Sequence, residues 1–233
     1  MQTLSYTKRR SELEAYFDRT AAEAWSRLTS DAPVSRIRAT VRAGRDRMRS
    51  TLLSWLPQDL RGCHLLDAGC GTGALAVEAA RRGADVLAID LSPTLIQLAA
   101  DRAPRDLGAG SIRFMVGDML DPPDGQFDHI VAMDSLIHYQ ASDMTRAVAA
   151  LTARAKRSVL FTFAPRTPAL AMMHAVGRLF PRGDRAPSIE PIEADTIRHR
   201  LITAPDMRAW LPTRSERVAS GFYTSQAMEM RKA

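Results

Sequence analysis

The sequence predicts an α/β fold with a doubly wound, mostly parallel sheet, an antiparallel C-terminal hairpin and an N-terminal helical arm. Short apolar runs alternate with helical stretches between residues 64 and 163, as in parallel strands joined by crossover helices. A glycine-rich turn directly follows the first of these runs. Residues 214–220 and 222–230 then form two alternating patterns joined at Gly221, which predicts the hairpin.

The composition is that of a globular protein of ordinary polarity. The 233 residues are 45% hydrophobic and 25% charged, enough for one large α/β domain with an appendage. We expect no signal peptide, because the N-terminus is polar, and no run approaches the ~20 apolar residues of a membrane span. The two cysteines, Cys63 and Cys70, flank an expected strand, which favours a reducing cytoplasm over a disulfide framework.

The net charge of +6 is concentrated near the N-terminus. Residues 1–62 carry 12 basic and 7 acidic side chains, whereas the remainder carries 20 and 19. Nucleic-acid enzymes more often show basic stripes interleaved with aromatic residues. Here the excess lies on one expected helical region, so we expect no nucleic-acid partner.

Residues 1–60 are expected to be helical, with an amphipathic helix in the second half that ends at Pro57. The basic face of this helix either is solvated and covers the sheet, or contacts anionic lipid or an acidic partner. The apolar face comprises Val34, Ile37, Val41, Met48, Leu52 and Trp55. The opposite face comprises Arg36, Arg38, Arg42, Arg45, Arg47 and Arg49.

Residues 65–73 read as a buried strand, a tight turn and the start of a helix. Glycines let the turn approach a ligand closely, and N–H groups at a helix start point towards it. Asp67 beside the turn suits a positively charged ligand such as S-adenosylmethionine, whereas a dinucleotide would place pyrophosphate there. Because Gly69, Gly71 and Ala74 also satisfy G-x-G-x-x-A, this stretch alone indicates only a nucleotide-like cofactor.

Further helices and strands are expected to follow in alternation. Ser92 and Pro93 form a helix start, with a capping hydroxyl before a proline at the first helical position. The expected strands are Val86–Ile89, Ile112–Val116, Phe127–Met133 and Ser158–Phe163, and the expected helices are Leu75–Arg82, one starting at Ser92, one from Ser142 to about Ala155, Pro168–Phe180, and 193–211 with a break at Pro205.

Polar side chains follow four successive strands: Asp67, Asp90, Asp118, and Asp134 with His138. Ligands of doubly wound sheets bind at the carboxyl ends of the strands. A carboxylate at Asp90 can accept both hydroxyls of a ribose. Asp118 can accept from an adenine amino group while the N–H of Met119 reaches the ring. With Asp67, this arrangement favours S-adenosylmethionine over NAD.

The motifs at residues 67–73, Asp90 and 117–119 resemble those of class I S-adenosylmethionine-dependent methyltransferases, which have a Rossmann-like sheet. The resemblance covers residues 60–165. It implies a domain over residues 61–233, preceded by an arm or lid over 1–60. The cofactor-binding residues that it implies are Asp67, Gly69, Gly71, Gly73, Asp90, Leu91, Asp118, Met119 and Asp134.

Residues 133–139, the ending 221–230 and the helix-rich N-terminus are similar to the magnesium-protoporphyrin IX O-methyltransferases of (bacterio)chlorophyll synthesis. The resemblance implies methylation of one propionate of magnesium protoporphyrin IX. It also suggests transfer of the substrate from the porphyrin-binding subunit of magnesium chelatase, and loose membrane association. Two alternatives are methylation of another small apolar carboxylate or phenol, and a non-catalytic cofactor-binding partner of the chelatase.

His138 is the candidate catalytic residue, expected to orient the substrate carboxylate by a hydrogen bond. Contact with the magnesium and capping of the loop remain alternatives, and no resident metal site is expected. Residues 165–212 are expected to cover the flat macrocycle. Candidate substrate-binding residues are Tyr139, Trp25, Met172, Met173 and Arg166. The N-terminal arm departs from the family pattern, since Thr29-Ser30 stand where Tyr-Gly is expected.

Overall fold

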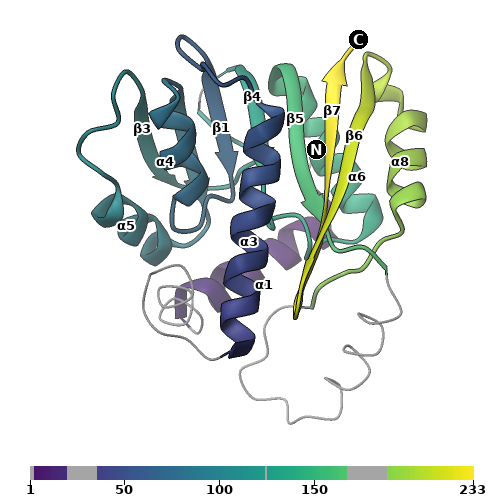
Figure 1. The fold of residues 1–233 in the computed structure, drawn as a ribbon. Coiled ribbons are helices and arrows are strands. Elements are labelled where there is room, and N and C mark those ends of the chain that lie inside the picture. The colour runs from purple at the N-terminus through teal and green to yellow at the C-terminus, as the bar shows by residue number, and fades with distance from the viewer. Residues whose placement is uncertain (1–2, 20–35, 124, 167–187) are drawn as a thin grey trace.

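The computed structural model describes residues 3–19, 36–123, 125–166 and 188–233. One seven-stranded sheet runs through the molecule in the order β3-β2-β1-β4-β5-β7-β6 (Figure 1). The first five strands in the chain pair in parallel, and the last two pair antiparallel. The strands are β1 His64–Ala68, β2 Asp85–Asp90, β3 Ser111–Val116, β4 Phe127–Ala132, β5 Ala155–Phe163, β6 Trp210–Ser220 and β7 Tyr223–Lys232.

This architecture confirms the predicted fold class: a mostly parallel Rossmann-like sheet with a C-terminal antiparallel hairpin and an N-terminal helix. Each parallel strand was expected within a few residues of its observed bounds. The hairpin differs more, because β6 begins at Trp210 rather than Arg214. A break in register between Pro212 and Ser215 interrupts its alternation, and the proline obscures the start of the strand in the sequence.

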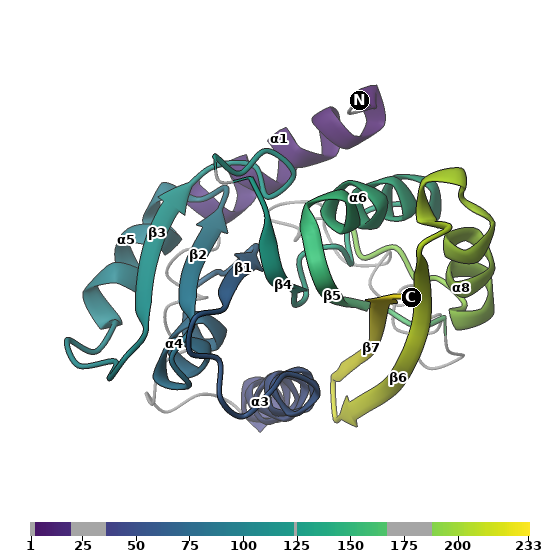
Figure 2. The same ribbon diagram turned by 90° about the horizontal axis from the view of Figure 1, so that it is seen from above.

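Helices cover both faces of the sheet (Figure 2). One core cluster joins α3 and α4 to one face, and the other joins α1, α6 and α8 to the opposite face. Successive side chains of β1 point to opposite faces of the sheet, so Leu65 belongs to the first cluster and Leu66 to the second. Within the described residues the α-helices are α1 Leu4–Arg19, α3 Arg36–Trp55, α4 Ala74–Arg81, α5 Pro93–Arg102, α6 Ala141–Arg154 and α8 Ala194–Thr203.

Local sequence signals set several of these boundaries. Ser92 caps α5 as predicted, because its hydroxyl accepts from the N–H of Leu95 at 3.2 Å and Pro93 opens the helix. The predicted break at Pro205 is also confirmed, since α8 ends at Thr203 and a 3₁₀ turn occupies Pro205–Met207. The apolar helix expected over residues 168–180 lies outside the described residues.

The helices α1 and α3 of the N-terminal region occupy different places. α1 lies at the edge where β1 and β5 end, whereas α3 packs on the sheet against β6 and β7 (Figure 1). The expected apolar face of α3 is wrong at its start, because Ile37 is 53% exposed and the buried part begins at Gly44. The prediction that the arginine face is solvated is wrong at Arg45, whose guanidinium points inward and pairs with Asp134.

Among the helices of the described ranges, none combines the length and apolar character needed to cross a bilayer.

Candidate active site

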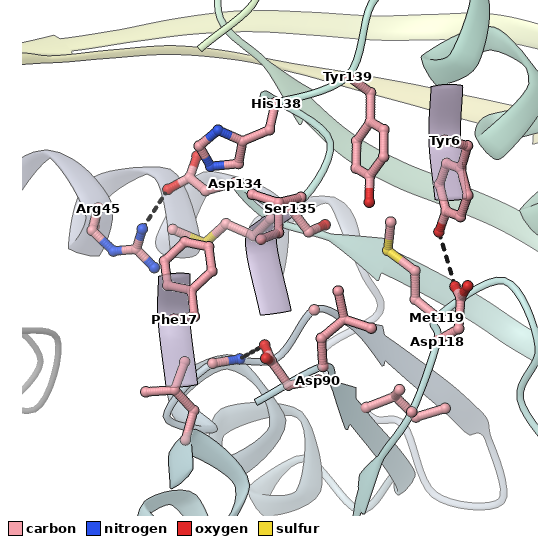
Figure 3. Close-up of a pocket in the computed structure, with 18 residues that line it drawn as sticks. Tyr6, Phe17, Arg45, Asp90, Asp118, Met119, Asp134, Ser135, His138 and Tyr139 are labelled. Carbon is pink, nitrogen blue, oxygen red and sulfur yellow. Dashed lines mark hydrogen bonds and ion pairs between the residues drawn. The ribbon is translucent and has the colours of Figure 1, made fainter. Parts of the chain in front are cut away.

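A cavity opens at the carboxyl edge of the sheet, where the parallel strands end (Figure 3). The glycine turn and the ends of β2 and β3 form one side, and the loop after β4 forms the other. Two helices complete the wall, since α1 contributes three side chains and α3 contributes Arg45. The lining includes Tyr6, Leu13, Phe17, Arg45, Gly69, Gly71, Asp90, Leu91, Asp118, Met119, Asp134, Ser135, His138 and Tyr139.

The glycine turn is fixed to the end of β2 by the half-buried carboxylate of Asp90. Gly69 and Gly71 both have positive φ, at 82° and 54°, a conformation that glycine adopts without strain. Asp90 accepts from the N–H of Gly71 at 2.8 Å and from that of Ser92 at 3.0 Å. Each carboxylate oxygen thus keeps acceptor capacity for a further donor, as a ribose diol would require. Burial raises the pKa of Asp90 above its ordinary value.

Asp67 lies behind the glycine turn with an acceptor that no group in the described part of the chain uses. Its side chain is buried and its Oδ2 has no hydrogen-bond partner among the described residues. Burial, and then the charge of Asp90, raise the pKa of Asp67 to about 7. A nearby cation would stabilise the ionised form. The orphaned oxygen therefore fits a cofactor that carries an ammonium and a sulfonium.

Asp118, at the end of β3, is held by helix α1. The Tyr6 hydroxyl donates to its Oδ1 at 2.8 Å, and the Arg10 guanidinium donates to its Oδ2 at 2.9 Å. The Tyr6 ring also stacks on Tyr139, with centroids 4.8 Å apart. Burial, followed by the charges of Tyr139 and Asp118, raises the pKa of Tyr6, so its hydroxyl stays a donor. The N-terminal helix is therefore part of the cavity wall at the predicted adenine end.

His138 lies in the loop after β4 and is 8% exposed. Its Nδ1 is 3.2 Å from the carbonyl oxygen of Ser188, which can only accept, so Nδ1 carries the proton. The ring also meets the Phe17 ring of α1 edge to face, with centroids 6.1 Å apart. These two contacts hold the ring in its orientation.

Asp134 opens the same loop and is surrounded by side chains from three elements. Arg45 of α3 donates to its Oδ2 at 2.8 Å, and Thr162 of β5 donates to its Oδ1 at 3.2 Å. Tyr223 and Ser225 of β7 also donate to this carboxylate, at 3.1 Å and 3.2 Å. The sequence placed Asp134 at this edge correctly, but gave no sign of these partners.

The structure brings most of the predicted site residues into one cavity. Asp67 and Gly73 lie just behind its lining, with Gly73 at the start of α4 close to the Phe114 ring. Arg166 lies elsewhere, largely exposed and 3.8 Å from Glu193. Trp25, Met172 and Met173 lie outside the described residues.

Sequence reasoning missed Tyr6, Arg10, Leu13, Phe17, Arg45 and Ser135 as site residues. Tyr6 contacts Asp118 across 112 positions of sequence, a separation that no local pattern reveals. Arg45 did carry a signal, because Gly44 precedes it inside a helix. An internal helical glycine is unfavourable and often marks a close approach.

The chain matches two families of known proteins. Residues 132–232 match the family described as the magnesium-protoporphyrin IX methyltransferase C-terminus, and residues 65–158 match a methyltransferase domain. A magnesium-protoporphyrin O-methyltransferase of Rhodobacter capsulatus is 49% identical over 97% of this chain and 98% of its own length. Another from Synechocystis is 30% identical over 71% of this chain and 73% of its own.

Solved structures agree with these sequence matches. The crystal structure of magnesium protoporphyrin IX methyltransferase from Synechocystis with bound SAH superposes with a TM-score of 0.84. It is 26% identical, and the match covers 96% of this chain and all of that one.

Proposed function

The chain belongs to the magnesium-protoporphyrin O-methyltransferases, and we propose that it esterifies a propionate carboxylate of magnesium protoporphyrin IX to give the monomethyl ester. It is an S-adenosylmethionine-dependent methyltransferase. The observation that carries the proposal is the 49% identity over 97% of the chain, which includes the N-terminal helices and the C-terminal hairpin as well as the cofactor domain.

The reaction makes modest chemical demands on the protein. A propionate has a pKa near 4.3, like glutamate, so at neutral pH it is already an ionised nucleophile. S-adenosylmethionine supplies a methyl group on its sulfonium. The new carbon–oxygen bond forms as the carbon–sulfur bond breaks, the electron pair stays on sulfur, and no proton is transferred. The protein must therefore exclude water and align the carboxylate, which can supply on the order of 7–11 kcal/mol.

Residues in and just behind the cavity wall are assigned to each part of the cofactor. Asp67 lies where a positive group would satisfy its unpartnered oxygen, and Asp90 keeps acceptor capacity for a ribose. Asp118 and the N–H of Met119 would receive the adenine ring. The glycine turn of Gly69, Gly71 and Gly73 allows the close approach, and Leu91 follows Asp90 in the cavity wall.

His138 is the residue that we assign to the carboxylate. Its Nδ1–H is used by Ser188, so Nε2 donates to a carboxylate only when the ring carries both protons. A carboxylate beside it would favour that charged form. His138 would thus orient the nucleophile and would not act as a base. Contact of the Nε2 lone pair with magnesium is the alternative that the neutral ring leaves open.

The macrocycle would lie between the N-terminal arm and residues 165–212. Tyr139 already packs against α1 through its stack on Tyr6, and it lines the cavity at the side that the macrocycle would approach. Trp25, Met172 and Met173 would complete an apolar cover. Arg166 would have to leave Glu193 to reach a propionate.

Two wider associations are also part of the proposal. An insoluble substrate favours direct transfer from the porphyrin-binding subunit of magnesium chelatase, and loose attachment of a cytoplasmic protein to the inner membrane. The outward arginines of α3, Arg36 and Arg38, are the first places to test for either contact. Pull-down or liposome binding that disappears at ~1 M salt would support an electrostatic contact, and persistence would contradict it.

Incubation with methyl-labelled S-adenosylmethionine and magnesium protoporphyrin IX, followed by pigment mass analysis, tests the reaction itself. We expect one added methyl group with the magnesium pigment and much less with metal-free protoporphyrin. Cofactor binding without transfer would refute the proposed substrate. If no methyl group is transferred, a shift in the porphyrin spectrum would indicate a non-catalytic protein that binds the pigment. The absence of a shift would indicate an enzyme that acts on another carboxylate or phenol.

A further inference from the structure

We propose that Asp134 is a positioning residue, held by Arg45 and Tyr223, so that α3 and the C-terminal strand β7 set the place of the loop that carries His138. This inference rests on the proposed function. It also gives Asp134 a different role from the cofactor contact that its position after β4 predicts.

The backbone at Asp134 is held in an unfavourable conformation. Within the described parts of the chain it is the one residue other than glycine with positive φ, at 55°. Side chains other than glycine adopt this region at a free-energy cost, although aspartate and asparagine tolerate it best. The Asp134 N–H donates to the Thr162 hydroxyl at 2.7 Å, which fixes the peptide on one side. Strain of this kind persists only where the surroundings over-determine it.

The carboxylate of Asp134 is saturated by protein donors. Arg45, Tyr223, Ser225 and Thr162 each donate to it, at 2.8, 3.1, 3.2 and 3.2 Å. Two carboxylate oxygens offer about four lone-pair sites, so these donors fill them. Its side chain is only 6% exposed. A cofactor ammonium would have to displace one of these donors to reach it.

Close packing of α3 on β7 brings the donors together. A Cβ atom added at Gly44 would lie 2.5 Å from Cδ1 of Tyr223, so the Tyr223 side chain packs on the helix backbone where only glycine leaves room. Arg45 follows Gly44 and thereby faces the turn at Asp134. Burial, then the charge of Asp134, raises the pKa of Tyr223, which keeps its hydroxyl a donor.

The loop that follows this anchor carries the groups nearest to the chemistry. Ser135 comes next in the chain, and a Cβ at Gly69 would lie 2.4 Å from its Cβ, so this residue packs directly on the glycine turn. His138 lies four positions beyond Asp134. A small shift of the anchor therefore moves His138 relative to the cofactor, and misplacement of about 1 Å can cost 10²-fold in rate.

The test compares Tyr223→Phe with Thr224→Val, which alters the neighbouring hydroxyl on the other face of β7. Tyr223→Phe keeps the ring against Gly44 and removes only the donor. We expect turnover with saturating substrates to fall about tenfold, and the cofactor Kd to stay within twofold. Hydrogen exchange should accelerate in residues 134–139. Thr224→Val should behave as wild type in all three measurements.

Asp134→Asn separates a positioning residue from a cofactor ligand, because asparagine tolerates the positive φ but lacks the charge. Positioning predicts a loss of turnover with a cofactor Kd within threefold of wild type. A tenfold weaker Kd with normal turnover at saturation would overturn the proposal, as would normal turnover and exchange in Tyr223→Phe. If wild type fails to methylate the porphyrin but Tyr223→Phe still accelerates exchange in the loop, the proposed substrate falls and the positioning role stands.

Discussion

The hydroxyl of Tyr6 donates to the carboxylate of Asp118 at 2.8 Å, joining the first helix of the chain to the end of β3. Arg10, one turn further along α1, donates to the other oxygen of the same carboxylate. Asp118, which we expect to bind the adenine, therefore also holds the N-terminal helix in place. Cofactor binding and the position of α1 are therefore expected to depend on each other.

Tyr6→Phe should speed release of S-adenosylmethionine. The substitution keeps the ring on Tyr139 but removes the hydrogen bond from the Tyr6 hydroxyl to Asp118. Hydrogen bonds to charged groups contribute about 1.5–3 kcal/mol, so we expect roughly tenfold faster dissociation. Stopped-flow displacement measures the rate. Ser11→Ala, an exposed change on the same helix, is the matched control, and equal off-rates in the two variants would disprove the coupling.

Asp90→Ala should weaken the cofactor complex and also loosen the glycine turn. It removes the acceptor of the Gly71 and Ser92 N–H groups together with the predicted ribose contact. We expect the Kd to rise at least 100-fold and the melting temperature to fall by several degrees. Asp85→Ala, at the start of the same strand, should leave the Kd unchanged. Calorimetry and thermal melts check both values, and a change in stability alone would remove the ribose role.

Cofactor affinity should rise with pH below neutrality because of Asp67. Its pKa in the ligand-free fold is about 7, above the ordinary aspartate value of 3.8, so ligand-free stability falls as pH rises through this window. A cationic ligand favours the ionised form, and binding therefore releases a proton below pH 7. The affinity should increase on the order of tenfold from pH 5.5 to 7.5.

Calorimetry in two buffers of different ionisation enthalpy measures that proton release. Asp67→Asn should bind more weakly and with little pH dependence, whereas Asp85→Asn should retain the wild-type profile. A wild-type affinity that is flat across this range would show that Asp67 does not face the positive groups of the cofactor.

Much of the fold was predictable because its signals are local. The alternation of strands and helices, the glycine turn and the cap at Ser92 each depend on a few neighbouring residues. The parallel order then brings Asp67, Asp90 and Asp134 to one edge, since β1 pairs with both β2 and β4. No contact between distant segments had to be known for this step.

The walls of the cavity were not predictable in the same way. α1 and α3 reach the site through contacts such as Arg45 to Asp134, which join residues 89 positions apart. A helical arginine next to other arginines looks solvated by pattern alone. The close approach of Gly44 to Tyr223 is what turns Arg45 inward, and it depends on where the hairpin folds back onto the sheet.

Substitutions at His138 should distinguish a substrate contact from a structural cap. His138→Ala is expected to lower turnover at least tenfold with cofactor affinity nearly unchanged, because the ring lies in the loop after β4 and not in the glycine turn. Asparagine places its amide near the position of Nδ1 and can keep the bond to Ser188, whereas glutamine places its amide near Nε2.

If Nε2 orients the carboxylate, His138→Gln should retain more turnover than His138→Asn. The reverse order would indicate that the bond from Nδ1 to Ser188 is the feature that matters, and that His138 acts only by capping the loop. The two orders are distinguished by steady-state turnover with magnesium protoporphyrin IX, measured together with the cofactor Kd of each variant. Tyr16→Phe is the control for the aromatic contact between Phe17 and His138, because Tyr16 precedes Phe17 in α1 and its ring meets the Phe17 ring edge to face.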